Sequence, residues 1–130
     1  MPAEIVVLAL GVALLLFHIA LQSISATVEL GSKWNASPRD EGVQPKGVIS
    51  GRAARALTNY LETFPAFVGL SLALAVTGQA GGWAATGAWL WLAARVIYIP
   101  LYVFGIPYIR SLVWTVSATG LFIMLVALVF

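Results

Sequence analysis

The segment that decides the fold reads Arg52-Ala-Ala-Arg55-Ala-Leu-Thr-Asn59-Tyr-Leu-Glu62-Thr-Phe-Pro65-Ala-Phe67. It joins a charged stretch to a long apolar run. Its polar residues are three, four and three positions apart, so a helix would place all of them within an arc of roughly 80°. Glu62 already lies inside the apolar part. Because a carboxylate is expensive to bury in a bilayer, its presence there indicates a partner and a function.

The composition is that of an integral membrane protein. The chain has 130 residues, of which 61% are hydrophobic and 9% charged, and its mean hydropathy is +0.96. It contains no cysteine and one histidine, so neither a disulfide nor a metal site is expected. A formal net charge of +2 is too small to indicate nucleic-acid binding.

The hydrophobic pattern predicts an all-α, four-helix transmembrane bundle that forms a single domain over residues 1–130. Each apolar run is long enough to span a bilayer, which takes about 20 residues. The predicted helices cover residues 4–29, 48–77, 83–104 and 108–130, and a loop covers residues 30–47. The first run lacks the basic start and the cleavage site of a signal peptide. Pro65 is expected to bend the second helix.

The distribution of Lys and Arg predicts the orientation. Five of the seven basic residues lie between Lys33 and Arg55. By the positive-inside rule, loop 30–47 and the turn at Gly105–Pro107 face the cytoplasm, and both termini face the other side. Within the loop, the sequence Ser37-Pro38-Arg39-Asp40 predicts a turn.

A layer of polar residues is predicted inside the bilayer. At the helical rise, Glu62 lies about 22 Å, Arg95 about 18 Å and Tyr98 about 22 Å from the non-cytoplasmic surface. Arg95, Tyr98 and Tyr102 also share one face of the third helix. Two interpretations are open, since Glu62 and Arg95 can form a structural ion pair or border a site.

The remaining cations gather near the predicted cytoplasmic mouth of this layer. Arg52, Arg55 and Arg110 exceed the one nearby carboxylate, a balance that suits an anionic, amphiphilic ligand. Other polar and aromatic residues are expected to have structural roles. His18 and Gln22 are predicted to form hydrogen bonds between helices. Three tryptophans are predicted to be interfacial anchors, namely Trp83, Trp89 and Trp91.

The run from Arg52 to Phe67 resembles the signature of the MAPEG family, the membrane-associated proteins of eicosanoid and glutathione metabolism. The later run Ala94-Arg95-Val-Ile-Tyr98-x-x-x-Tyr102, followed by Arg110-Ser111, is similar to the family's third and fourth helices. The resemblance covers essentially the whole chain. The segment Pro38–Glu41 is similar to one in a bacterial branch, which implies the inner membrane of a bacterium.

The resemblance implies a homotrimer in the lipid bilayer, with glutathione as co-substrate between neighbouring subunits. Arg55, Asn59 and Glu62 match residues that hold glutathione. Tyr98 and Tyr102 match tyrosines that contact the ligand, and Arg110 is similar to the arginine that stabilises the thiolate. The resulting hypothesis assigns catalysis to Arg110 and Tyr102, and glutathione binding to Arg52, Arg55, Asn59, Glu62, Arg95 and Tyr98.

The implied activity is that of a glutathione transferase or peroxidase. A thiol has a pKa of about 8.5, and a nearby cation favours the thiolate. The thiolate would attack an apolar electrophile or reduce a lipid hydroperoxide. Thr63 stands where the leukotriene-forming branch has a tyrosine, and Lys33 only loosely replaces one of its arginines, so eicosanoid chemistry is not expected.

Two alternatives are open. A non-catalytic protein of the MAPEG fold would bind lipid, glutathione or a partner without turnover. A small multidrug-type transporter would share the length and the four spans. Such a transporter typically needs a carboxylate in the middle of its first helix, whereas Glu4 and Glu29 lie at the two ends of that helix here.

Overall fold

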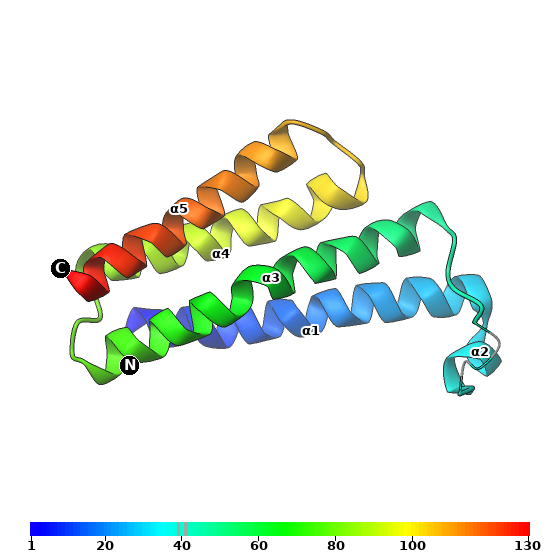
Figure 1. The fold of residues 1–130 in the computed structure, drawn as a ribbon, viewed down its shortest axis with the longest axis horizontal. Coiled ribbons are helices and arrows are strands. Elements are labelled where there is room, and N and C mark those ends of the chain that lie inside the picture. Colours follow the sequence, from blue (N-terminus) through cyan, green and yellow to red (C-terminus); the bar gives the residue numbers. More distant parts are fainter. Residues whose placement is uncertain (39, 41) are drawn as a thin grey trace.

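The computed structural model describes residues 1–38, 40 and 42–130. Within these residues the chain is helical and contains no strand. The helices are α1 (Ala3–Leu30), α2 (Ser32–Ala36), α3 (Val48–Val76), α4 (Gly82–Val103) and α5 (Ile109–Val129) (Figure 1). All except α2 are long and apolar enough to cross a membrane.

One local feature differs from the prediction. The predicted loop at residues 30–47 contains the short helix α2, directly after α1. The predicted turn at Ser37–Asp40 includes Arg39, which lies outside the described residues, as does Glu41 of the family-like segment. Helix α3 runs without a break through Pro65, although a proline removes one backbone hydrogen bond from a helix.

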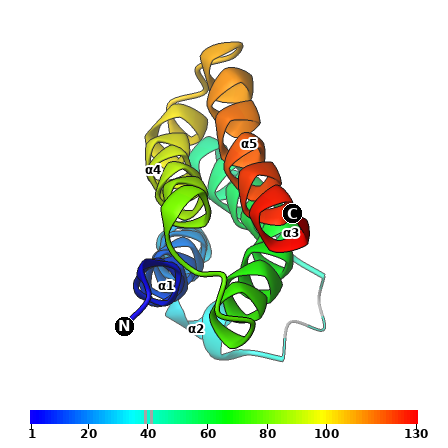
Figure 2. The same ribbon diagram turned by 90° about the vertical axis from the view of Figure 1, so that its left-hand side faces the viewer.

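The long helices alternate in direction and form two antiparallel pairs, α1 with α3 and α4 with α5 (Figures 1 and 2). Helix α4 packs against each of the other three. Both termini lie at one end of the bundle (Figure 1). The loop before α3 and the turn between α4 and α5 lie towards the opposite end (Figure 1).

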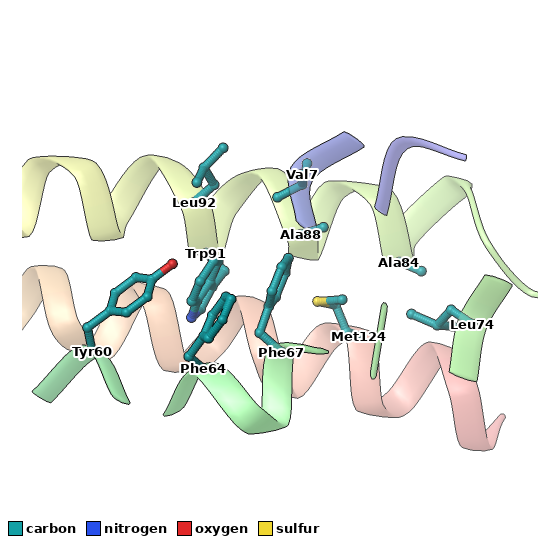
Figure 3. Close-up of a cluster of buried hydrophobic side chains, with 10 residues drawn as sticks. All are labelled: Val7, Tyr60, Phe64, Phe67, Leu74, Ala84, Ala88, Trp91, Leu92 and Met124. Carbon is teal, nitrogen blue, oxygen red and sulfur yellow. The ribbon is translucent and has the colours of Figure 1, made fainter. Parts of the chain in front are cut away.

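An aromatic cluster forms the core at the centre of the bundle (Figure 3). The rings of Phe67 and Trp91 stack with centroids 4.0 Å apart and planes 8° apart. Tyr60 and Phe64 extend the cluster along α3. The prediction that Trp91 is an interfacial anchor was therefore wrong, because its side chain has no exposed surface. Trp83, in contrast, is 77% exposed.

Two acidic residues, one near each end of α1, accept hydrogen bonds from the N-termini of other helices. At its start, the buried Glu4 carboxylate accepts a hydrogen bond of 2.7 Å from the backbone N–H of Gly81, the N-cap of α4. At its end, Glu29 accepts one of 2.6 Å from Gly47, the N-cap of α3. Carboxylates are favourable at these positions because helix N-termini expose unpaired N–H groups and partial positive charge.

Candidate functional site

A polar pocket of about 370 Å³ opens between α3, α4 and α5, in the half of the bundle that contains the α4–α5 turn. It is lined by Asn59, Tyr98, Tyr102, Arg110, Ser111, Trp114 and Thr115. Its polar lining contrasts with that of an apolar groove of about 560 Å³ between α1 and α4. The polar pocket is therefore the candidate site.

Tyr98 and Tyr102 come from α4, and Arg110 from the first turn of α5. The two tyrosines are one helical turn apart, and their ring centroids are 5.5 Å from each other. The chain then reverses through Gly105 and Tyr108, whose φ angles are 69° and 57°. This reversal brings the Arg110 guanidinium to 4.8 Å from the centre of the Tyr102 ring, within the range of a cation–π interaction.

Arg95 lies behind the pocket and does not line it. Its side chain is fully buried, with its guanidinium carbon 4.5 Å from the centre of the Tyr98 ring and 5.3 Å from that of Tyr60. Its Nη1 donates a hydrogen bond of 2.8 Å to Oδ1 of Asn59. The alternative of a Glu62–Arg95 ion pair is not what the structure shows, because Arg95 bonds to Asn59 and Glu62 is exposed.

Three other charged residues of the predicted site, Arg52, Arg55 and Glu62, lie outside the pocket. Arg52 donates from Nη1 to the backbone carbonyl of Val103 at 2.9 Å, so it caps the C-terminus of α4, where a cation is favoured. Arg55 and Glu62 are exposed on α3. Within the part of the chain that the structure describes, neither forms a hydrogen bond or an ion pair. Of the residues singled out from the sequence, the structure thus brings Asn59, Tyr98, Tyr102 and Arg110 together in the pocket.

Sequence reasoning did not assign Thr115 to the site, and it used Ser111 only as part of a motif. It named Trp114, four residues after Arg110, only as a fluorescent reporter of glutathione binding. On α5, Ser111, Trp114 and Thr115 follow Arg110 by one, four and five residues, which places them on the same side of the helix. That spacing was the available signal. The indole N–H of Trp114 is buried and has no partner among the described residues.

His18 does not form the hydrogen bond between helices that was predicted for it. Its ring is fully buried and packs against Tyr60, with centroids 4.8 Å apart. Both of its ring nitrogens lack a partner in the described part of the chain, and the Gln22 side chain likewise makes no hydrogen bond to a described residue. The contact that fixes His18 is therefore between rings.

Hydrogen-bond donors dominate the pocket. Arg110 can only donate, and the tyrosine and serine hydroxyls can also donate. Among the described residues, no carboxylate lines the pocket. A cation among converging donors suits an anionic group, because charge-assisted hydrogen bonds are about twice as strong as neutral ones.

Comparison with known proteins identifies a family for this chain. The sequence model of the MAPEG family matches residues 7–130, nearly the whole chain. Searches of curated proteins and of solved structures gave no significant match.

Proposed function

Because the chain belongs to the MAPEG family, we propose that this multi-pass membrane protein is a glutathione-dependent transferase or peroxidase. Its substrates would be apolar electrophiles or lipid hydroperoxides. The observation that carries the proposal is the Arg110 guanidinium, held 4.8 Å from the Tyr102 ring in a pocket rich in donors. A cation held in this way favours the thiolate form of a bound thiol.

The side chains of the site match the groups of glutathione. Glutathione has two carboxylates, one amine and one thiol. The donors of Asn59, Tyr98 and Ser111 suit a carboxylate, and Arg110 suits the sulfur. Arg55 and Glu62, on the exposed face of α3, would hold the second carboxylate and the amine. The protein itself needs no nucleophile, since positioning and electrostatic stabilisation supply the rate.

Arg110 would act on the sulfur, and Tyr102 on the oxygen that leaves in the peroxidase reaction. The guanidinium favours the thiolate over the thiol, so the thiol proton leaves to solvent before the attack. In the transferase reaction a carbon–sulfur bond forms, and the leaving group departs with its electron pair. In the peroxidase reaction the sulfur takes the outer oxygen as the O–O bond breaks. The Tyr102 hydroxyl can give a proton to the departing alkoxide, and a second glutathione then yields the disulfide and water.

The exposed charges of α3 support a homotrimer with shared sites. Arg55 and Glu62 lie within the first half of a helix of 29 residues that is long enough to span a membrane. Charged side chains that face lipid are costly, and they normally face protein or a water-filled cavity. A neighbouring copy of the chain that covers this face would bring Arg55 and Glu62 towards a pocket between subunits. We place the trimer in a bacterial inner membrane, with loop 30–47 in the cytoplasm.

The test is a titration of glutathione against the purified protein in detergent, with the oligomeric state measured on the same sample. Trp114 lines the pocket, so its fluorescence is the expected signal. Turnover is then measured with chlorodinitrobenzene and with a lipid hydroperoxide. Binding to a trimer with turnover of either substrate supports the proposal. Binding without turnover identifies a non-catalytic member of the family, and absence of both overturns the proposal.

A further inference from the structure

We propose that Arg95 is a positioning residue, which turns the Asn59 side chain so that its NH₂ group faces the pocket and selects an anionic ligand. The identity of that ligand as glutathione rests on the proposed function. The orientation of Asn59 does not, because it follows from the contacts of Arg95 alone.

The orientation follows from the chemistry of the two side chains. A guanidinium has five N–H donors and no acceptor, whereas an amide has one oxygen acceptor and one NH₂ donor group. Asn59 must therefore turn its oxygen towards Arg95, as the bond of 2.8 Å from Nη1 to Oδ1 shows. Asn59 lines the pocket and Arg95 does not. The NH₂ group is left for the pocket, with no partner in the described part of the chain.

Arg95 itself cannot turn easily, because its fully buried side chain packs against two rings. Its guanidinium carbon lies 4.5 Å from the centre of the Tyr98 ring and 5.3 Å from that of Tyr60. The Tyr60 hydroxyl in turn donates to the backbone carbonyl of Gly11 on α1, at 2.5 Å. The direction of the Asn59 amide is thus fixed through contacts that reach three helices.

Arg95 is poorly explained as a stabilising residue. Its Nε and Nη2 are buried and have no partner among the described residues, and it forms no ion pair with a described carboxylate, since its one side-chain hydrogen bond goes to Asn59. Buried donors without partners are destabilising, and apolar side chains often stabilise a protein more than buried charges do. A residue that weakens the fold in this way is better explained by its effect on the adjacent pocket.

Substitution of Asn59 by aspartate distinguishes the effect of the amide's orientation on ligand binding from an effect on the stability of the fold. Asn59→Asp retains an oxygen for Arg95 but replaces the NH₂ group in the pocket with a second acceptor. We expect the melting temperature to stay the same or to rise. Glutathione affinity should fall roughly 10- to 100-fold, the range for a lost hydrogen bond to a charged group. Thr58→Val, at the exposed neighbouring position, is the control and should bind as the wild type does.

A double-mutant cycle tests whether Arg95 acts through Asn59. Arg95→Met should weaken glutathione binding in the wild-type background and have little further effect in an Asn59→Ala background. Arg95→Lys, which retains a donor, should restore part of the affinity. An Arg95→Met effect of equal size in both backgrounds would overturn the proposal, since a general structural defect does not depend on Asn59.

Nuclear magnetic resonance tests the orientation without any ligand. The two Asn59 amide protons should give one sharp pair of signals, with contacts to protons of pocket-lining residues. Arg95→Met should broaden or shift this pair. Contacts from the amide protons to Arg95 instead of the pocket would overturn the proposal. If wild-type protein binds no glutathione, the proposed function fails, and this measurement still decides the role of Arg95.

Discussion

Gly87 on α4 and Gly120 on α5 pack backbone against backbone, so that a Cβ atom on either one would lie 2.6 Å from the carbonyl oxygen of the other. Such a close approach is possible only without side chains. The contact lies about three turns along α4 from Tyr98. It fixes the two helices to each other at one level, and the pocket is formed between the same two helices further along, near their connecting turn.

We expect Gly87→Ala to lower the stability of the bundle. Alanine is a better helix former than glycine by about 1 kcal/mol, but a clash with backbone atoms cannot be relieved by rotating a side chain. Overpacking typically destabilises by about 1–3 kcal/mol, so the clash should outweigh the helix preference. Thermal unfolding in detergent measures the effect. Ala93→Ser also adds one heavy atom to α4, but at an exposed position, and should change little. An increase in melting temperature for Gly87→Ala would contradict the close contact.

Removing the carboxylate of Glu29 should loosen the loop before α3. Glu29 accepts hydrogen bonds from the backbone N–H groups of Lys46 and Gly47 and from the Ser50 hydroxyl. In Glu29→Gln the amide nitrogen cannot accept, so at least one of these donors loses its partner. We expect faster trypsin cleavage after Lys46 and a lower melting temperature. Asp40→Asn removes the same charge within the loop and is the control. Equal cleavage rates in the two variants would show that Glu29 does not hold the loop.

The arc of polar residues on α3 shows what the sequence could and could not predict. Helical spacing placed Arg55, Asn59 and Glu62 on one side of α3, and the structure agrees. However, the arc lies across the boundary of the buried face. Asn59 therefore reaches the pocket, whereas Arg55 and Glu62 are exposed. Spacing gives the relative angles of side chains, but the rotation of the whole helix depends on its packing partners.

The same limitation explains the other differences. The helical rise predicted Glu62 and Arg95 at a similar depth in the bilayer. Two side chains at the same depth come into contact only if both helices turn them towards each other. Trp91 was predicted at an interface from its position near a helix end, and its rotation instead buries it against Phe67. Arg52 caps α4 through a residue 51 positions away, a contact for which the local sequence has no signal. The four spans were predictable because they depend only on local hydrophobicity.

Glu62 should recognise the amine of glutathione in the proposed trimer. Glu62→Gln retains the size of the side chain and removes its charge, so the contribution of the ion pair is lost. We expect wild-type protein to bind glutathione more tightly than N-acetylglutathione, which has no cationic amine. The variant should bind the two compounds with similar affinities. Asp40→Asn is again the control, and a variant that still discriminates as the wild type does would exclude Glu62 from amine binding.

The two arginines of the proposed site should affect different kinetic constants. Arg110 lies over Tyr102 in the pocket, where its charge would stabilise the thiolate and the transition state. We expect Arg110→Ala to lower kcat about 100- to 1,000-fold, as for the loss of one electrostatic contact to a reacting group, with little change in glutathione affinity. Arg55 is exposed on α3 and would hold a carboxylate far from the sulfur. Arg55→Ala should therefore raise the Kd for glutathione and leave kcat at saturation nearly unchanged.

Steady-state kinetics with chlorodinitrobenzene, together with a glutathione titration of each variant, separates these effects. The loss of a contact that forms only in the transition state lowers kcat. The loss of a contact that is equally strong in the ground state and the transition state raises KM and leaves kcat unchanged. Raising the pH provides a further test of Arg110. Without the guanidinium, the thiol keeps a pKa nearer its usual value, so the residual activity of Arg110→Ala should rise with pH over a range in which the wild-type activity is already constant. Parallel pH profiles for the two proteins would show that Arg110 does not act on the thiol.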